Sequence, residues 1–193
     1  MGLRTYKTIA VFGAGDCPST TLCNQTERLG RILHDLGAIV ATGAYGGIME
    51  AAAKGAVQAG GEAKGYTFQG EPGNDYITQA TDCQALAQKS GIALPYLDYL
   101  IRMGYLMDSN GFIAVAGGGS GTGLELVATM VFNDKLWPER RPVSIYKPPS
   151  VPGRRWDNKM LRSLLWQFRV SEQTAAMYRI FKDPHAAVRH ALS

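Results

Sequence analysis

Two glycine-rich stretches in the sequence have the composition of anion-binding turns. The longer one, GGGSGTGLE from Gly117 to Glu125, follows the apolar run Phe112–Ala116. Glycines leave a turn without Cβ atoms, so backbone N–H groups can approach a phosphate, and a helix that follows adds the positive end of its dipole. We therefore interpret the stretch as strand, turn and helix around a phosphate, bound by Gly118, Gly119, Ser120, Gly121 and Thr122.

Glu125 is the residue of this stretch that can do acid–base chemistry. It lies one turn into the predicted helix, where a carboxylate would face whatever the turn binds. A second interpretation is also open. Thr122 and Glu125 have the spacing of a capping box, in which Glu125 would bond to the backbone of its own helix instead of a ligand.

The second glycine-rich stretch precedes an alanine-rich segment that is typical of a helix, from Ile48 to Ala59. Met49 in this segment could pack in the core or contact a base. Glu50 could form an i, i+4 ion pair with Lys54 or face a ligand. The residues expected at the ligand site from here and from the end of the first predicted strand are Gly43, Gly46, Gly47, Met49, Glu50, Gly15 and Asp16.

The elements that must position these turns alternate along the chain. The first half reads as strand, helix, strand, helix, strand, over Thr8–Phe12, Thr20–Leu36, Ala38–Thr42, Ile48–Ala59 and Ala63–Phe68. This order predicts an α/β fold, a Rossmann-like, doubly wound, mainly parallel sheet with helices on both faces, in a single domain of residues 1–193. In such sheets ligands bind beyond the carboxyl ends of the strands, where both glycine turns would lie.

The second half continues with elements of the same kind. We expect helices over Tyr96–Ser109, Asp157–Phe168 and Pro184–Leu192, and strands over Pro142–Tyr146 and Met177–Phe181. Gln69–Ser90 reads as a loop with one short strand or helix, and the helix after the long glycine turn opens at Leu124. The proline-rich Lys147–Arg155 suits a solvated connection or a basic flap over a phosphate.

Composition limits the function classes. The chain has 193 residues, a formal net charge of +4 and 46% hydrophobic residues, with its basic residues scattered. This favours a small anionic ligand over nucleic acid. Cys17, Cys23 and Cys83 lack metal-ligand spacing, and their odd number fits a disulfide framework poorly. With no signal peptide and no membrane-spanning run, the sequence predicts a cytoplasmic protein without metal or membrane partners.

The segment Gly43–Tyr66, Arg102 and Gly117–Glu125 together resemble the LONELY GUY family, often mislabelled as lysine decarboxylases. The family signature PGGxGTxxE is matched at every fixed position except Gly117, which stands in place of proline. The resemblance implies a Rossmann-like homodimer without a cofactor. It further implies an N-glycosidase, a phosphoribohydrolase that cleaves a nucleoside 5'-monophosphate, AMP or a cytokinin nucleotide, to the free base and ribose 5-phosphate. Arg102 and Glu125 would be catalytic, whereas spacing alone favours a surface pair of Arg102 with Asp98.

The chain departs from the family pattern beside the catalytic arginine. The family run Met-His-Glu-Arg-Lys is Tyr-Leu-Ile-Arg-Met here, so Ile101 and Met103 replace two charged neighbours. In the second loop, Thr42, Ala44 and Glu50 stand where the family has glycines. The same motifs also resemble molybdenum-cofactor carrier proteins, which bind without hydrolysis. A non-catalytic nucleotide or molybdenum-cofactor binding protein is therefore the alternative function.

Overall fold

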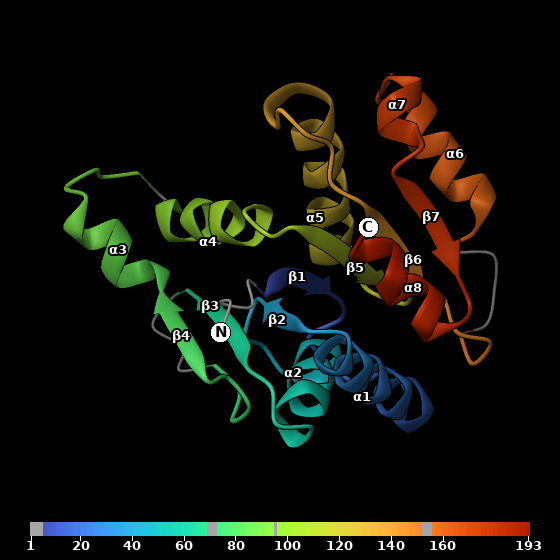
Figure 1. Ribbon diagram of the computed structural model, residues 1–193. Helices are drawn as coiled ribbons and strands as arrows, with labels where there is room; N and C mark the ends of the chain where they lie inside the picture. The colour runs from blue at the N-terminus through green and yellow to red at the C-terminus, as the bar shows by residue number, and fades with distance from the viewer. Residues whose placement is uncertain (1–5, 69–72, 95, 152–155) are drawn as a thin grey trace, which may run out of the picture.

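The computed structural model describes residues 6–68, 73–94, 96–151 and 156–193. Within these ranges, seven strands form one sheet (Figure 1). The strand order is β4-β3-β2-β1-β5-β6-β7, and every neighbouring pair is parallel. The strands are β1 (Lys7–Phe12), β2 (Ala38–Thr42), β3 (Ala63–Thr67), β4 (Gln79–Asp82), β5 (Gly111–Val115), β6 (Val143–Tyr146) and β7 (Tyr178–Phe181). The predicted Rossmann-like α/β fold is confirmed.

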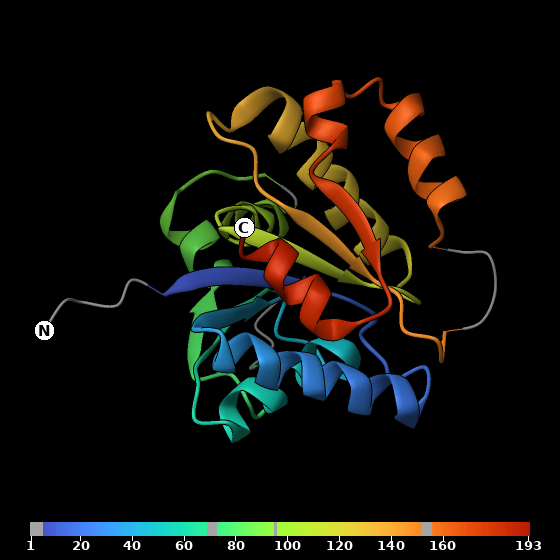
Figure 2. The same ribbon diagram turned by 45° about the vertical axis from the view of Figure 1, so that its right-hand side comes forward.

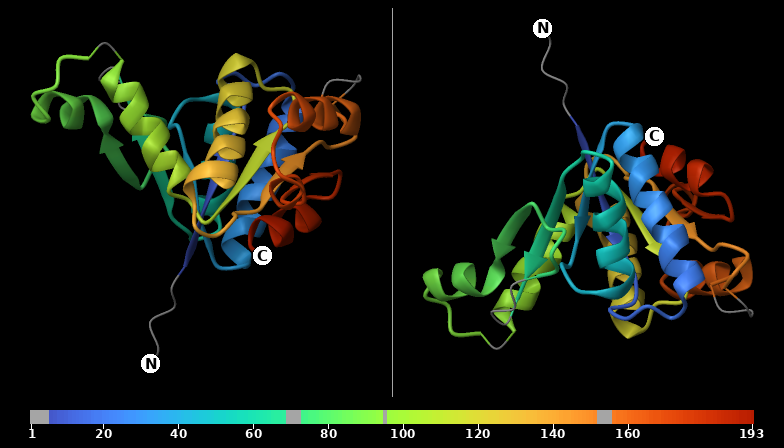
Figure 3. Two further views of the ribbon diagram at one scale, coloured as in Figure 1. Left: turned by 90° about the horizontal axis from the view of Figure 1, so that it is seen from above. Right: turned by 90° about the horizontal axis from the view of Figure 1, so that it is seen from below.

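The strand order reverses at β1. Strand β1 pairs with β2 on one side and with β5 on the other, so the chain first builds the sheet outward to β4 and then crosses back to build it toward β7. The connections that leave β1 and β5 lead to helices on opposite faces of the sheet (Figure 3). Such a switch point opens a crevice at the carboxyl ends of the two strands, which is where doubly wound sheets bind ligands.

Helices cover both faces of the sheet (Figures 1 and 3). One face carries α1 (Thr20–Asp35), α2 (Gly47–Gln58) and α8 (Pro184–Ala191), and Figure 2 shows α8 alongside α1. The other face carries α4 (Leu97–Met107), α5 (Ser120–Val131) and α6 (Asn158–Gln167).

Strand β5 shows why the sheet strands are apolar throughout. Ile113 and Val115 pack into the core under α1, whereas Phe112 and Ala114 pack into the core on the opposite face. A strand that is buried on both sides loses the usual alternation of apolar and polar residues.

Two sequence expectations about elements need correction, and two further elements were not predicted. The stretch predicted as a loop with one short element holds both a strand, β4, and a helix, α3 (Cys83–Lys89); its residues 69–72 lie outside the described ranges. Helix α5 begins at Ser120 rather than Leu124, because Gly119 caps it in an extended conformation. The chain also forms a π-helical turn at Phe132–Leu136 and a short helix α7 (Glu172–Ala175), neither of which was predicted. Residues 152–155 of the proline-rich loop are likewise outside the described ranges.

The cysteines also differ from expectation. Cys17, just after the first loop, and Cys23 on α1 form a disulfide, with their Cα atoms 6.1 Å apart. Cys83 is a buried free thiol. The odd number of cysteines is compatible with a disulfide because the third one, Cys83, is buried in the core. Among the described residues, no helix has the length and apolarity needed to cross a bilayer.

Candidate functional site

A cavity of about 340 Å³ opens at the switch point between β1 and β5. This volume is at the small end of the range of ligand-binding pockets, about 300–1,000 Å³. The loop after β1, the loop after β2, the residue after β3 and the helices α2, α4 and α5 each contribute to its wall. The lining residues are Gly13, Ala14, Gly15, Asp16, Tyr45, Met49, Phe68, Tyr99, Arg102, Gly119, Ser120, Gly121, Thr122 and Glu125.

The N-terminus of α5 contributes the turn Gly119–Thr122 to the cavity wall. Its cap residue Gly119 is extended, with φ −90° and ψ −151°, and no side chain caps the first N–H groups of the helix. Uncapped N–H groups and the helix dipole together favour a negatively charged ligand. The preceding Gly118 does not line the cavity; a Cβ there would lie 2.3 Å from the Thr122 hydroxyl, so glycine leaves room for that side chain.

The capping-box interpretation of Thr122 and Glu125 is wrong. The helix is capped by Gly119, which places Thr122 inside the first turn instead of at the cap position. Thr122 is 2% exposed and Glu125 is 5% exposed, and the carboxylate of Glu125 faces Arg102.

Arg102 projects inward from α4 and is only 4% exposed. Its Nε donates a hydrogen bond of 3.0 Å to the Tyr66 carbonyl oxygen, and its Nη2 lies 3.9 Å from Glu125 Oε1. The surface pair with Asp98 that spacing favoured is therefore wrong, because the guanidinium is buried with Glu125. Gly43 leaves room for the guanidinium, because a Cβ atom at this position would lie 1.6 Å from Arg102 Nη2.

Three aromatic rings surround the guanidinium and line the same cavity; we call Tyr45, Phe68 and Tyr99 the aromatic collar. The Arg102 Cζ is 5.3 Å from the ring centres of Tyr45 and Phe68 and 5.7 Å from that of Tyr99. Phe68 meets both tyrosines edge to face, with ring centres 5.7 Å and 5.4 Å apart. Each cation–π contact contributes roughly 0.5–2 kcal/mol.

Sequence reasoning did not assign the collar to the site, and it also missed Gly13 and Ala14. The available signal was an aromatic residue directly after β3, another in the second glycine loop, and a third one helical turn before Arg102. None of these three aromatic residues indicates a binding site when it is considered alone.

Burial governs the acid–base chemistry of Glu125. Removal from water raises the pKa of this carboxyl from 4.5 to about 7, and the positive charge of Arg102 opposes the rise without cancelling it. A bonded guanidinium would pull the pKa down, but at 3.9 Å the two groups share no hydrogen bond. A carboxyl that titrates near neutral pH is suited to exchange protons with a ligand or with water.

The other predicted residues divide into those in the wall and those behind it. Gly15, Asp16 and Met49 line the cavity, whereas Gly43, Gly46, Gly47 and Glu50 do not. Gly47 has a φ of +64°, and a Cβ there would lie 2.2 Å from the Asp16 carbonyl oxygen, so it supports the first loop.

The proposed pairing of Glu50 with Lys54 also needs correction. The Lys54 Nζ lies 2.9 Å from the Glu27 carboxylate on α1, and this is the ion pair that the lysine forms. Glu50 is half-buried beside Gly46, outside the cavity wall. Within the described ranges, no group of three or more His, Cys, Asp or Glu side chains is arranged to hold a metal ion.

The sequence profile of the SLOG cluster4 family matches residues 6–137, which is more than half of the chain. The chain belongs to the SLOG cluster4 family. The matched part of this SLOG cluster4 protein runs from β1 through α5, so it contains every residue of the cavity wall. No curated protein sequence matches the chain significantly.

Solved structures similar to the SLOG cluster4 chain include two molybdenum-cofactor proteins. The Moco carrier protein from Chlamydomonas reinhardtii has a TM-score of 0.67 and 20% identity over 97% of this chain and 98% of that chain. The molybdenum cofactor binding protein from the phototrophic bacterium Rippkaea orientalis has a TM-score of 0.64 and 21% identity, over 96% and 95%. DNA processing protein A from Streptococcus pneumoniae has a TM-score of 0.54 and 15% identity, over 95% and 61%.

These comparisons confirm the resemblance drawn from the glycine motifs, both to LONELY GUY-like proteins and to molybdenum-cofactor carriers. At such low identities, the structural likeness establishes the fold alone. The ligand and the reaction are therefore inferred from the residues of the cavity.

Proposed function

We propose that this SLOG cluster4 protein is a phosphoribohydrolase that cleaves the N-glycosidic bond of a nucleoside 5'-monophosphate. The observation that carries the proposal is the placement of Glu125, a buried carboxyl with a pKa of about 7, beside Arg102 and the anion-binding turn in one cavity. The turn accepts the 5'-phosphate, which fixes the ribose relative to the carboxyl.

The reaction requires water to attack the C1' atom of the ribose while the bond to the base breaks. The bonding electrons leave with the base nitrogen, which takes up a proton, and ribose 5-phosphate forms. Glu125 in its ionised form accepts the proton of the attacking water and stabilises the positive charge that builds on the sugar. A guanidinium carries only hydrogen-bond donors and no acceptor, so Arg102 cannot be the base. It provides a fixed cation for the charge that develops on the leaving group.

Product analysis tests this proposal. The protein is incubated with AMP, and the mixture is separated by chromatography to detect adenine and ribose 5-phosphate. We expect both products from the wild type, and a loss of turnover in Glu125→Gln and Arg102→Met. Glu172→Gln, on the exposed surface of α7, is the matched control and should retain activity. Intact AMP after long incubation, with binding preserved, would contradict the hydrolase proposal.

A second candidate function is binding without hydrolysis, of a nucleotide or of the molybdenum cofactor. The observation that favours it is the pair of apolar residues beside Arg102. Ile101 and Met103 are half-buried and pack against the core where LONELY GUY proteins have Glu and Lys, so those charges are missing. This candidate predicts a ligand-dependent rise in melting temperature without any product.

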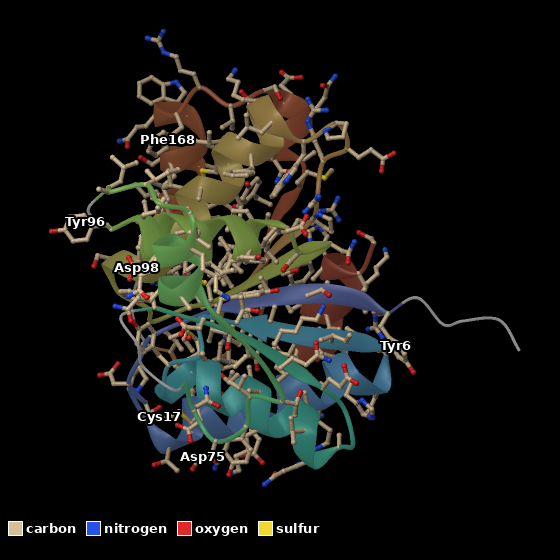
Figure 4. All side chains as sticks on the ribbon, turned by 90° about the vertical axis from the view of Figure 1, so that its left-hand side faces the viewer. Tyr6, Cys17, Asp75, Tyr96, Asp98 and Phe168 are labelled. Atoms are coloured by element: carbon tan, nitrogen blue, oxygen red, sulfur yellow. A yellow bond between two sulfur atoms is a disulfide. The ribbon has the colours of Figure 1, made fainter. Side chains whose placement is uncertain are left out.

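We also propose, from the resemblance, that the protein is a homodimer. Large apolar side chains are exposed at the start of α4 and just before it, and Figure 4 shows Tyr96 pointing away from the ribbon. Tyr96 is 76% exposed, and Leu100 is 59% exposed. Light scattering should give twice the mass of the chain, and Leu100→Lys should lower that mass; a monomeric wild type would contradict this part.

A further inference from the structure

The distance between Arg102 and Glu125 is unusual for buried groups of opposite charge. In a dry site the attraction between such charges is strong, and unrestrained arginine–carboxylate pairs close to roughly 2.7–2.9 Å, commonly with two hydrogen bonds. Here the nearest nitrogen and oxygen stay 3.9 Å apart although both side chains are buried. Other contacts must therefore hold the guanidinium in place.

Two sets of contacts hold it. The Tyr66 carbonyl oxygen fixes one edge of the guanidinium through Nε. The aromatic collar surrounds the rest, with three ring centres within 5.3–5.7 Å of Cζ. Because Phe68 packs edge to face against both Tyr45 and Tyr99, the three rings support one another and form a fixed wall.

We propose that Tyr45, Phe68 and Tyr99 are positioning residues that hold the Arg102 guanidinium beside Glu125 while preventing a bonded ion pair. This inference rests on the proposed function, because it assigns the collar to the same reaction. The collar takes the place of the charged neighbours that Arg102 lacks at Ile101 and Met103. It leaves the carboxylate of Glu125 available to accept a proton from water.

The pKa of Glu125 depends on the position of Arg102, because few other charged groups among the described residues lie near the carboxyl. The titratable or charged side chains of the cavity wall, besides Glu125, are Asp16, Tyr45, Tyr99 and Arg102. Of these, Arg102 is the group whose charge affects the carboxyl. The Cys83 thiol near the guanidinium is neutral, because burial raises its pKa to about 11. A change in the titration of Glu125 therefore reports movement of Arg102 or entry of water.

The test is a titration of Glu125 in protein labelled with ¹³C in the glutamate carboxyl groups. Its resonance is identified by its loss in Glu125→Gln. We compare Phe68→Leu and Tyr99→Leu, which remove one ring but keep an apolar side chain, with Phe68→Tyr and Tyr99→Phe, which keep the ring. Tyr105→Leu, on the same helix but outside the collar, is the matched control. Each leucine substitution is repeated in an Arg102→Met background, and folding is checked by melting temperature.

We expect each leucine variant to lower the pKa of Glu125 by about one pH unit or more, which is a tenfold change in its protonation equilibrium. The ring-keeping variants and Tyr105→Leu should keep the wild-type value. In the Arg102→Met background the leucine substitutions should have no further effect, because the rings act through the arginine. If one leucine variant does not fold, the other decides the question.

Two results would overturn the inference. One is an unchanged titration of Glu125 in the leucine variants. The other is an equal fall in the Arg102→Met background, which would assign the effect to water entering the cavity. Failure of the proposed function is a separate result: it would show as no hydrolysis of AMP by the wild type, and it would leave the titration behaviour intact.

Discussion

Arg102 Nη2 lies 3.9 Å from Glu125 Oε1, and this contact joins two helices, α4 and α5, on the same face of the sheet. The chain enters strand β5 from α4 and leaves it toward α5, so this strand sets how the two helices lie relative to each other. Burial of the pair excludes water from it and raises the pKa of Glu125 to about 7.

Gly43→Ala should displace Arg102 although the substituted residue lies outside the cavity wall. A Cβ at this position would lie 1.6 Å from Nη2, so the guanidinium must move. A displacement of about 1 Å at a catalytic group commonly lowers the rate about 100-fold, and we expect at least that loss in AMP hydrolysis. Gly104→Ala on α4 is the control, because a Cβ there meets nothing within 4 Å. Equal rates in the two variants would contradict the role given to Gly43.

Gly121→Asp should weaken phosphate binding while leaving the fold intact. A Cβ at Gly121 meets no atom within 4 Å, and a carboxylate in the first turn suits the helix dipole. The same charge repels a phosphate bound at the turn by about 1–4 kcal/mol, which weakens binding by roughly fivefold to several hundredfold. The measurement is the rise in melting temperature with added phosphate or AMP. Gly121→Ala, which adds bulk without charge, separates steric from electrostatic effects; the same loss in both would argue against an anion site.

Glu125 should make the stability of the protein depend on pH in a defined direction. Because its pKa is raised from 4.5 to about 7, the folded protein keeps a proton that the unfolded chain has already lost across this range. Its stabilising contribution is thus full below about pH 4.5 and is lost as the pH rises through 7. Relative to Glu125→Gln, the wild type should lose roughly 3 kcal/mol of unfolding free energy between about pH 4 and pH 8. Denaturant melts at several pH values measure this difference; a parallel course for the two proteins would contradict the raised pKa.

The disulfide can be checked by counting thiols. Cys17 and Cys23 are paired, and Cys83 is buried, so the native protein should take up no alkylating reagent. Unfolding without reductant should expose one thiol, and unfolding with reductant should expose three. Mass spectrometry reads these numbers directly. Three reactive thiols in the unreduced, unfolded chain would show that the bridge does not form in solution.

The strands and glycine turns were predictable because local signals mark them. The apolar run Ala38–Thr42, placed between Gly37 and Gly43, matches the observed β2 at both ends. The start of α5 was not predictable in the same way. Gly121 and Gly123 have poor helix propensity, yet they lie inside the helix, because packing of residues such as Leu126 and Met130 against the core outweighs local preference.

The site was less predictable than the fold, because its contacts join distant segments. Spacing favoured a surface pair of Arg102 with Asp98, and nothing near Arg102 in the chain shows that Gly43 leaves a space for its guanidinium. The rings of Tyr45, Phe68 and Tyr99 come together through the order of β1, β2 and β3 in the sheet and the packing of α4 on it. Pairwise contacts of this kind follow from topology and cannot be inferred from spacing.

The most direct measurement of the central claim is a crystal structure of Glu125→Gln grown with AMP, paired with a wild-type crystal soaked in AMP. The variant should hold intact AMP, with its phosphate at the anion-binding turn Gly119–Thr122 and its C1' atom facing residue 125. The wild type should hold ribose 5-phosphate in the same place. A phosphate bound elsewhere, or intact AMP in the wild-type crystal with its C1' atom turned away from Glu125, would contradict the account.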